Sequence, residues 1–150
     1  MNTCDLIALG SFLGACLAAV YARWAWREAR RANDIATHAK RMEIYKAFDA
    51  LKFAMVQKAY SISHEDTGRF YSPSRDSEFY FTPEVHDKLW RYFEICFDLA
   101  EWNLKKTTRN PTGEELEQLR KEQDRLLSEE AALSIEIDAV LRSELKIARG

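Results

Sequence analysis

Few side chains in this sequence are of types that bind metals or act as nucleophiles. The histidines are His38, His64 and His86, and only His64 has acidic neighbours, Glu65 and Asp66. Adjacent residues in a loop rarely converge on one ion, and neither H-E-x-x-H nor C-x-x-C accompanies them. We therefore expect a solvated polar turn at residues 64–66, with no metal and no cofactor.

The cysteines and carboxylates give no stronger indication of catalysis. Cys96 lies within an apolar stripe and is interpreted as a small core residue. Cys4 would face the oxidising side of a membrane in the topology derived below, where it could bridge two chains. The sequence has no glycine-rich phosphate loop and no G-x-S-x-G, and Glu129-Glu130 is interpreted as solvated surface. We expect a protein that is not an enzyme.

Length and charge indicate one small domain with an uneven charge distribution. The 150 residues are 47% hydrophobic and 31% charged, which is typical of a globular chain. Only 5 glycines and 3 prolines favour long helices. The net charge of −2 conceals +5 over residues 23–60 and −6 over residues 61–150. This balance gives no reason to expect nucleic acid as a partner.

Residues 6–22 form the longest apolar segment and contain no charged side chain. As a helix these residues would extend roughly 25 Å, slightly less than the ~30 Å hydrocarbon core of a bilayer. The sequence therefore predicts a transmembrane anchor over residues 1–26. Two alternatives stay open: cleavage or lipidation at Cys16, because Leu13-Gly14-Ala15-Cys16 has the form of a lipobox, and a buried soluble helix.

The charges that flank the apolar segment predict its orientation. The side before it carries only Asp5, whereas four arginines follow it closely. The positive-inside rule then places the carboxy-terminal part in the cytoplasm and Met1 outside a bacterial inner membrane. The predicted topology and interface residues, whose aromatic members would lie at headgroup level, are Arg23, Trp24, Trp26, Arg27, Arg30 and Arg31.

Small residues recur along the predicted span at every fourth position, at Gly10, Gly14, Ala18 and Ala22. A G-x-x-x-G ridge of this kind permits close packing of helices in lipid. We therefore expect this face to pack helix against helix and to support a homo-oligomer.

Three further helices are expected, over residues 27–60, 83–107 and 113–148. Ile44, Phe48, Leu51 and Met55 recur at helical spacing in the first of them. Residues 61–82 contain serine, aspartate, glycine and proline and are predicted to be a loop. The span is expected to continue into the first helix, with Asn33-Asp34 as the only plausible interruption.

These elements predict an all-α fold, in which a transmembrane helix continues into a three-helix antiparallel cytoplasmic bundle over residues 27–150. The near-heptad pattern of the last helix is interrupted by Gln123, Glu130 and Glu144. Polar residues at such positions fit an intramolecular bundle better than a long two-stranded coiled coil.

The order of these parts resembles a loose group of uncharacterised bacterial single-pass membrane proteins with a cytoplasmic helical domain. The similarity lies in the apolar span, in the segment Arg41-Met42-Glu43-Ile44-Tyr45-Lys46-Ala47-Phe48, and in Phe79-Tyr80-Phe81-Thr82-Pro83-Glu84-Val85. It covers about residues 5–105 and implies no activity.

We therefore expect a membrane-anchored helical scaffold that contacts lipid and an unknown protein partner. The alternative is a membrane-perturbing effector, such as a small toxin or phage-defence protein, that oligomerises through its span. The residues predicted to form the interaction surface are Glu43, Tyr45, Phe70, Tyr71, Phe79 and Phe81.

Overall fold

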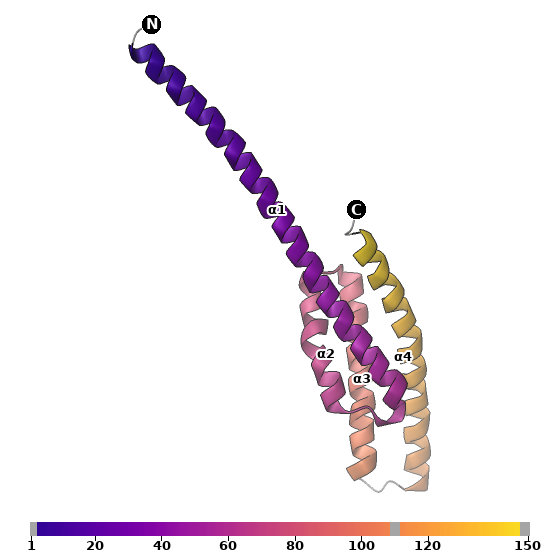
Figure 1. The fold of residues 1–150 in the computed structure, drawn as a ribbon. Helices are drawn as coiled ribbons and strands as arrows, with labels where there is room; N and C mark the ends of the chain where they lie inside the picture. The colour runs from indigo at the N-terminus through magenta and orange to yellow at the C-terminus, as the bar shows by residue number, and fades with distance from the viewer. Residues whose placement is uncertain (1–2, 109–111, 148–150) are drawn as a thin grey trace. The chain divides into compact units, whose positions relative to one another are not determined.

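The computed structural model describes residues 3–108 and 112–147; it does not describe the side chains of residues 3–10, 107 and 147. All regular structure in these residues is helical, which confirms the predicted all-α class (Figure 1). The elements in chain order are α1 (Thr3–Lys58), η1 (Ala59–Ser61), α2 (His64–Asp76), η2 (Ser77–Phe79), α3 (Pro83–Thr108) and α4 (Gly113–Ile147).

The chain divides into two compact units, residues 1–37 and residues 38–150. The first unit consists of the amino-terminal part of α1, which continues through Asn33 and Asp34 without interruption. Every side chain of residues 11–36 is exposed. The division falls further along the chain than the predicted boundary between residues 26 and 27.

Within the described part of the chain, no helix combines the length and apolarity that crossing a membrane requires. The predicted span, residues 6–22, begins among residues whose side chains lie outside that part.

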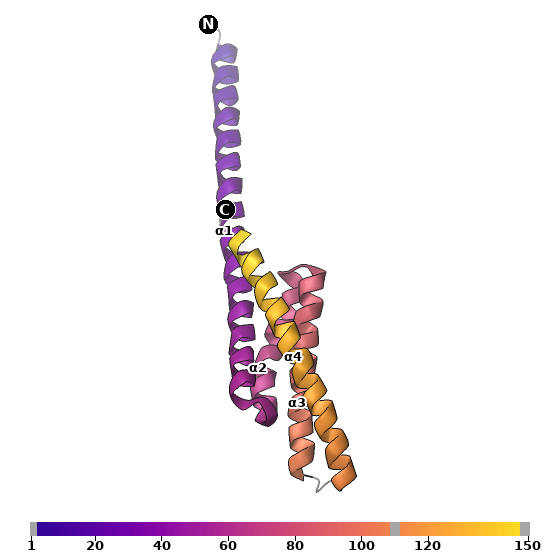
Figure 2. The same ribbon diagram turned by 90° about the vertical axis from the view of Figure 1, so that its right-hand side faces the viewer.

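The described part of the second unit contains four α-helical segments, so the prediction of three was wrong. Figures 1 and 2 show the carboxy-terminal part of α1 beside α2, α3 and α4, with successive segments running in opposite directions. The α1 helix ends where Ala59 adopts a φ of 32°, a left-handed conformation that typically terminates a helix. The second unit is thus a helical bundle in which α2 is an additional member.

The predicted loop over residues 61–82 was also wrong, because most of this segment is α2 followed by η2. Ser63 caps α2 in a capping box, in which its hydroxyl accepts from the Asp66 N–H and the Asp66 carboxylate accepts from the Ser63 N–H. The buried Thr67 and Ser74 donate their hydroxyls to carbonyls one turn earlier. A hydroxyl satisfied in this way occupies the core as a small side chain.

The core of the second unit contains the stripe that sequence periodicity predicted on α1. Ile44, Phe48, Leu51 and Met55 are all buried there. The Phe48 ring packs edge-on against Tyr92 of α3, with ring centroids 5.1 Å apart. Each such side chain contributes roughly 1.5–3 kcal/mol on burial, so this stripe is a major part of what holds α1 to the other helices.

Candidate functional site

A buried hydrogen bond joins α3 to α4 at Glu130, one of the residues that interrupt the heptad pattern. The Tyr92 hydroxyl donates to the Glu130 carboxylate across 2.6 Å, and both side chains are buried. Burial raises the pKa of Glu130, while the Tyr92 hydrogen bond and the charge of Lys52 oppose that shift. The neighbouring Cys96 is a buried core residue as expected, and burial raises the pKa of its thiol.

The other two interruptions of the heptad pattern also have partners. Gln123 is buried and donates its side-chain N–H to the amide oxygen of Asn103, whose own N–H donates to the Ile62 carbonyl. Glu144 lies 4.0 Å from the Arg41 guanidinium. The polar positions of α4 therefore contact other segments of the same chain.

Arg41 connects three parts of the second unit. Its Nε donates to the Tyr80 carbonyl across 2.7 Å, and its guanidinium lies 5.5 Å from the centre of the Phe81 ring. Together with the Glu144 contact, these interactions hold the segment after η2 against α1 and α4.

Asp138 of α4 receives several donors. The Tyr45 hydroxyl donates across 3.3 Å, Arg142 donates across 3.0 Å and the Lys52 ammonium lies 3.7 Å away. Although burial raises the pKa of Asp138, these hydrogen bonds and charges lower it below its usual value overall. Tyr45, one of the predicted interaction residues, is thus half-buried in a contact within the bundle.

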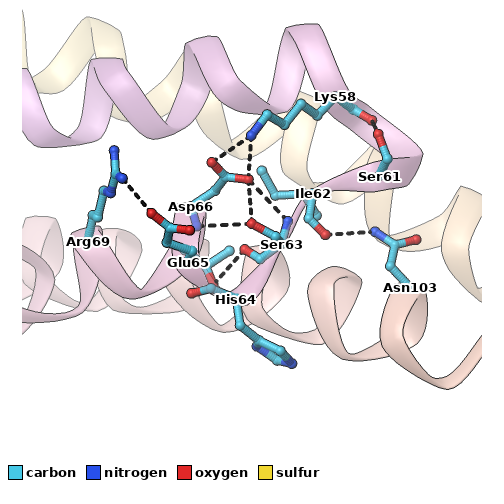
Figure 3. A network of polar contacts seen from close by, with 10 residues as sticks. Lys58, Ser61, Ile62, Ser63, His64, Glu65, Asp66, Arg69 and Asn103 are labelled. Carbon is cyan, nitrogen blue, oxygen red and sulfur yellow. Dashed lines mark hydrogen bonds and ion pairs between the residues drawn. The ribbon is translucent and has the colours of Figure 1, made fainter. Parts of the chain in front are cut away.

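The segment His64-Glu65-Asp66 belongs to the start of α2, and its three side chains diverge (Figure 3). Asp66 accepts two hydrogen bonds of 2.8 Å from the Lys58 ammonium, Glu65 pairs with Arg69 at 2.7 Å, and the His64 ring packs 4.8 Å from Phe97. The Lys58 and Ser63 hydrogen bonds lower the pKa of Asp66. The described residues contain no group of three or more histidine, cysteine, aspartate or glutamate side chains placed to hold a metal ion.

The structure separates the predicted interaction residues into two groups. Phe70 and Phe81 are core residues, which excludes them from an exposed surface, whereas Tyr71 and Phe79 are exposed. Glu43 is exposed and pairs with Lys40 at 2.8 Å. An open cavity of about 420 Å³ has both Glu43 and Phe79 in its lining, so the structure does bring these two residues together.

The predicted membrane residues all lie on α1 in the first unit. Gly14, Ala18 and Ala22 are exposed, and a Cβ added at Gly14 would meet nothing within 4 Å. The surroundings of Gly10 lie outside the described residues. Arg23, Trp24, Trp26, Arg27, Arg30 and Arg31 are exposed too, and the Arg30 guanidinium lies 5.6 Å from the Trp26 ring centre.

Sequence reasoning missed a row of aromatic rings that crosses from α2 to α3. We call this row the aromatic ladder; neighbouring ring centres are 4.8–6.1 Å apart. Phe97 and Tyr71 are the most exposed members. The aromatic residues of α3 recur in the sequence at steps of three and four residues. The residues of α2 were predicted to form a loop, so their contacts with α3 were not predicted. The members are His64, Tyr71, Trp90, Phe93 and Phe97.

Comparisons with protein families, with curated proteins and with solved structures found no match to this chain. Its function must therefore be inferred from the surfaces of the two units.

Proposed function

We propose that the protein is a membrane-anchored helical scaffold, in which residues 1–26 anchor the chain in a bilayer and the second unit binds another protein. The observation that carries the proposal is the exposure of large apolar side chains on α1. Seven of them between residues 12 and 26 are each 54–71% exposed, and they are Phe12, Leu13, Leu17, Val20, Tyr21, Trp24 and Trp26. Contiguous exposed apolar surface of this kind marks a membrane or protein contact.

The sequence order along α1 supports a membrane contact in particular. The uncharged residues 6–22 come first and are followed by Arg23, then by Trp24 and Trp26, and then by the remaining arginines up to Arg31. Tryptophan favours the headgroup region, and arginines just beyond it attract anionic lipid on the cytoplasmic side. This order supports the proposed orientation, with Met1 outside and the second unit in the cytoplasm.

Two contacts between proteins belong to the same proposal. The small-residue face, which includes Gly14 and Ala18, would pack against a second copy within the bilayer. The second unit would present its exposed side chains to a different protein.

Alkaline washing of membranes from cells that express the full chain tests the proposed anchor. Alkaline washing removes peripheral proteins from membranes but does not extract a chain whose helix is inserted in the bilayer. We therefore expect the wild-type chain to stay in the membrane pellet. Leu13→Lys/Leu17→Lys should move it to the supernatant, since each central lysine costs roughly 2.5–3.5 kcal/mol on insertion.

The matched control places the same charges outside the predicted span. Ala32→Lys/Ala36→Lys changes two exposed residues of α1 and should leave the chain in the pellet. Wild-type protein in the supernatant, or equal release of both variants, would contradict the proposal.

A further inference from the structure

The aromatic ladder continues directly into a row of carboxylates on α3. Glu94, Asp98 and Glu101 are spaced by four and three residues, so they share one helix face. The Trp90 indole N–H donates to Glu94 across 3.0 Å, which joins the two rows. On α3 the exposed Phe97 and the half-buried Trp90 therefore lie beside these carboxylates, whereas Phe93 is buried.

The negative charge of this face is only partly neutralised within the chain. Glu94 lies 3.5 Å from Arg91, and Glu101 lies 2.9 Å from Lys105. Asp98 is exposed and has no ion pair among the described residues. Partial burial and the negative charges of Glu101 and Glu94 raise the pKa of Asp98, whereas the positive charges of Arg91 and Lys105 oppose that shift.

From this geometry we infer that the surface of α2 and α3 formed by the exposed members of the aromatic ladder and by Glu94, Asp98 and Glu101 binds a basic amphipathic helix of a partner protein. The inference rests on the proposed function and specifies the chemistry of its protein partner. Lysine or arginine side chains of the partner would lie over Phe97 and pair with Asp98.

The spacing of the two rows agrees with a helical partner. Glu94 to Glu101 spans seven residues, or about 10.5 Å along a helix axis. Cationic residues at positions i, i+4 and i+7 of a partner helix repeat over the same length. Apolar residues between them would cover Tyr71 and Phe97, and cations over such rings gain an additional attraction.

The test measures binding of synthetic peptides to the full chain in nanodiscs of phosphatidylcholine, a lipid without net charge that does not attract basic peptides. The probe is a fluorescent alanine- and leucine-rich helix with lysines at i, i+4 and i+7. A second peptide of the same composition distributes its lysines around the helix. We expect the first peptide to bind at least about fivefold more tightly, since only its cations and apolar residues match one face.

Two variants of the protein examine the two parts of the site. Phe97→Leu keeps apolar bulk but removes the π face, and Asp98→Asn removes the unpaired charge. Each should weaken binding of the first peptide about fivefold, an effect of the size expected for one exposed cation–π or ion pair. Circular dichroism verifies that both variants keep the helical fold.

The charge-matched control is Glu117→Gln, which removes an exposed carboxylate of α4 that pairs with Lys121 at 2.9 Å. It should leave binding unchanged. Equal binding of the two peptides, or equal weakening by Glu117→Gln and Asp98→Asn, would overturn the inference. So would occupation of this face by a second copy, seen as crosslinking of Asp98→Cys to another chain. The membrane-pellet assay is independent of these results, so failure here is distinguishable from failure of the proposed anchor.

Discussion

The hydrogen bond between Tyr92 and Glu130 provides a quantitative test of how the bundle is held together. Tyr92→Phe would leave the Glu130 carboxyl buried without its donor, which costs about 1.5–3 kcal/mol. Glu130→Leu would leave the Tyr92 hydroxyl without its acceptor, which costs about 1–3 kcal/mol. Replacing both residues removes both unsatisfied groups, so the double variant should be less destabilised than either single variant.

Thermal unfolding followed by circular dichroism, with the full chain in mild detergent, measures this cycle. A cost of about 2 kcal/mol lowers the Tm of a unit of this size by about 8 °C. Tyr60→Phe is the matched control, because the Tyr60 hydroxyl makes a similar bond of 3.0 Å to Asp124 on an exposed surface. We expect no measurable change of Tm in this control.

The same pair predicts a pH dependence whose sign follows from burial. The pKa of Glu130 is raised in the folded chain, so its contribution to stability is present below its unfolded pKa and is lost as pH rises through the folded pKa. The Tm of the wild type should therefore fall relative to that of Glu130→Gln between about pH 4.5 and neutrality. The reasoning would be refuted if the destabilising effects of the two single variants simply added up in the double variant. It would also be refuted if the Tm difference between the wild type and Glu130→Gln stayed constant across this pH range.

Four further predictions concern other parts of the chain. Ser63→Ala should lower the Tm by about 4 °C through loss of the N-cap of α2. The pKa of Asp66 is lowered in the folded chain, so the stabilising effect of this carboxylate should be present at pH values above the usual pKa of aspartate and be lost as pH falls through the lowered pKa. Thermal unfolding of Asp66→Asn and of the wild type across this pH range measures the effect. Gly14→Ile should reduce self-association in a membrane two-hybrid assay, and an unchanged signal would exclude this packing face. Overexpression should leave the membrane potential intact when followed with a potential-sensitive dye, whereas its collapse would favour the alternative of a membrane-perturbing effector.

Local periodicity was sufficient to predict the helices whose apolar residues recur at regular spacing. The buried stripe of Ile44, Phe48, Leu51 and Met55 on α1 is the clearest case. The same reasoning failed on α2, where serine, glycine and proline indicate a loop. There the buried hydroxyls bond to their own helix, so Ser74 occupies a position that an apolar residue would normally mark.

The partners of the polar residues could not be predicted from the sequence, because they lie far apart along the chain. Glu130 was visible as an interruption of the heptad pattern, but its donor Tyr92 is 38 residues earlier. The aromatic ladder was missed for a related reason. Tyr71 belongs to α2, so its position beside Trp90 follows only when that helix is known.

Quenching of tryptophan fluorescence by brominated lipids tests the membrane assignment most directly. The full chain with Trp90→Phe and Trp102→Phe keeps only Trp24 and Trp26 as emitters. In vesicles of phosphatidylcholine, we expect bromines near the headgroup end of the acyl chain to quench strongly and bromines near its terminal methyl to quench weakly, as for residues at the membrane interface. Emission that no brominated lipid quenches would contradict the proposed anchor.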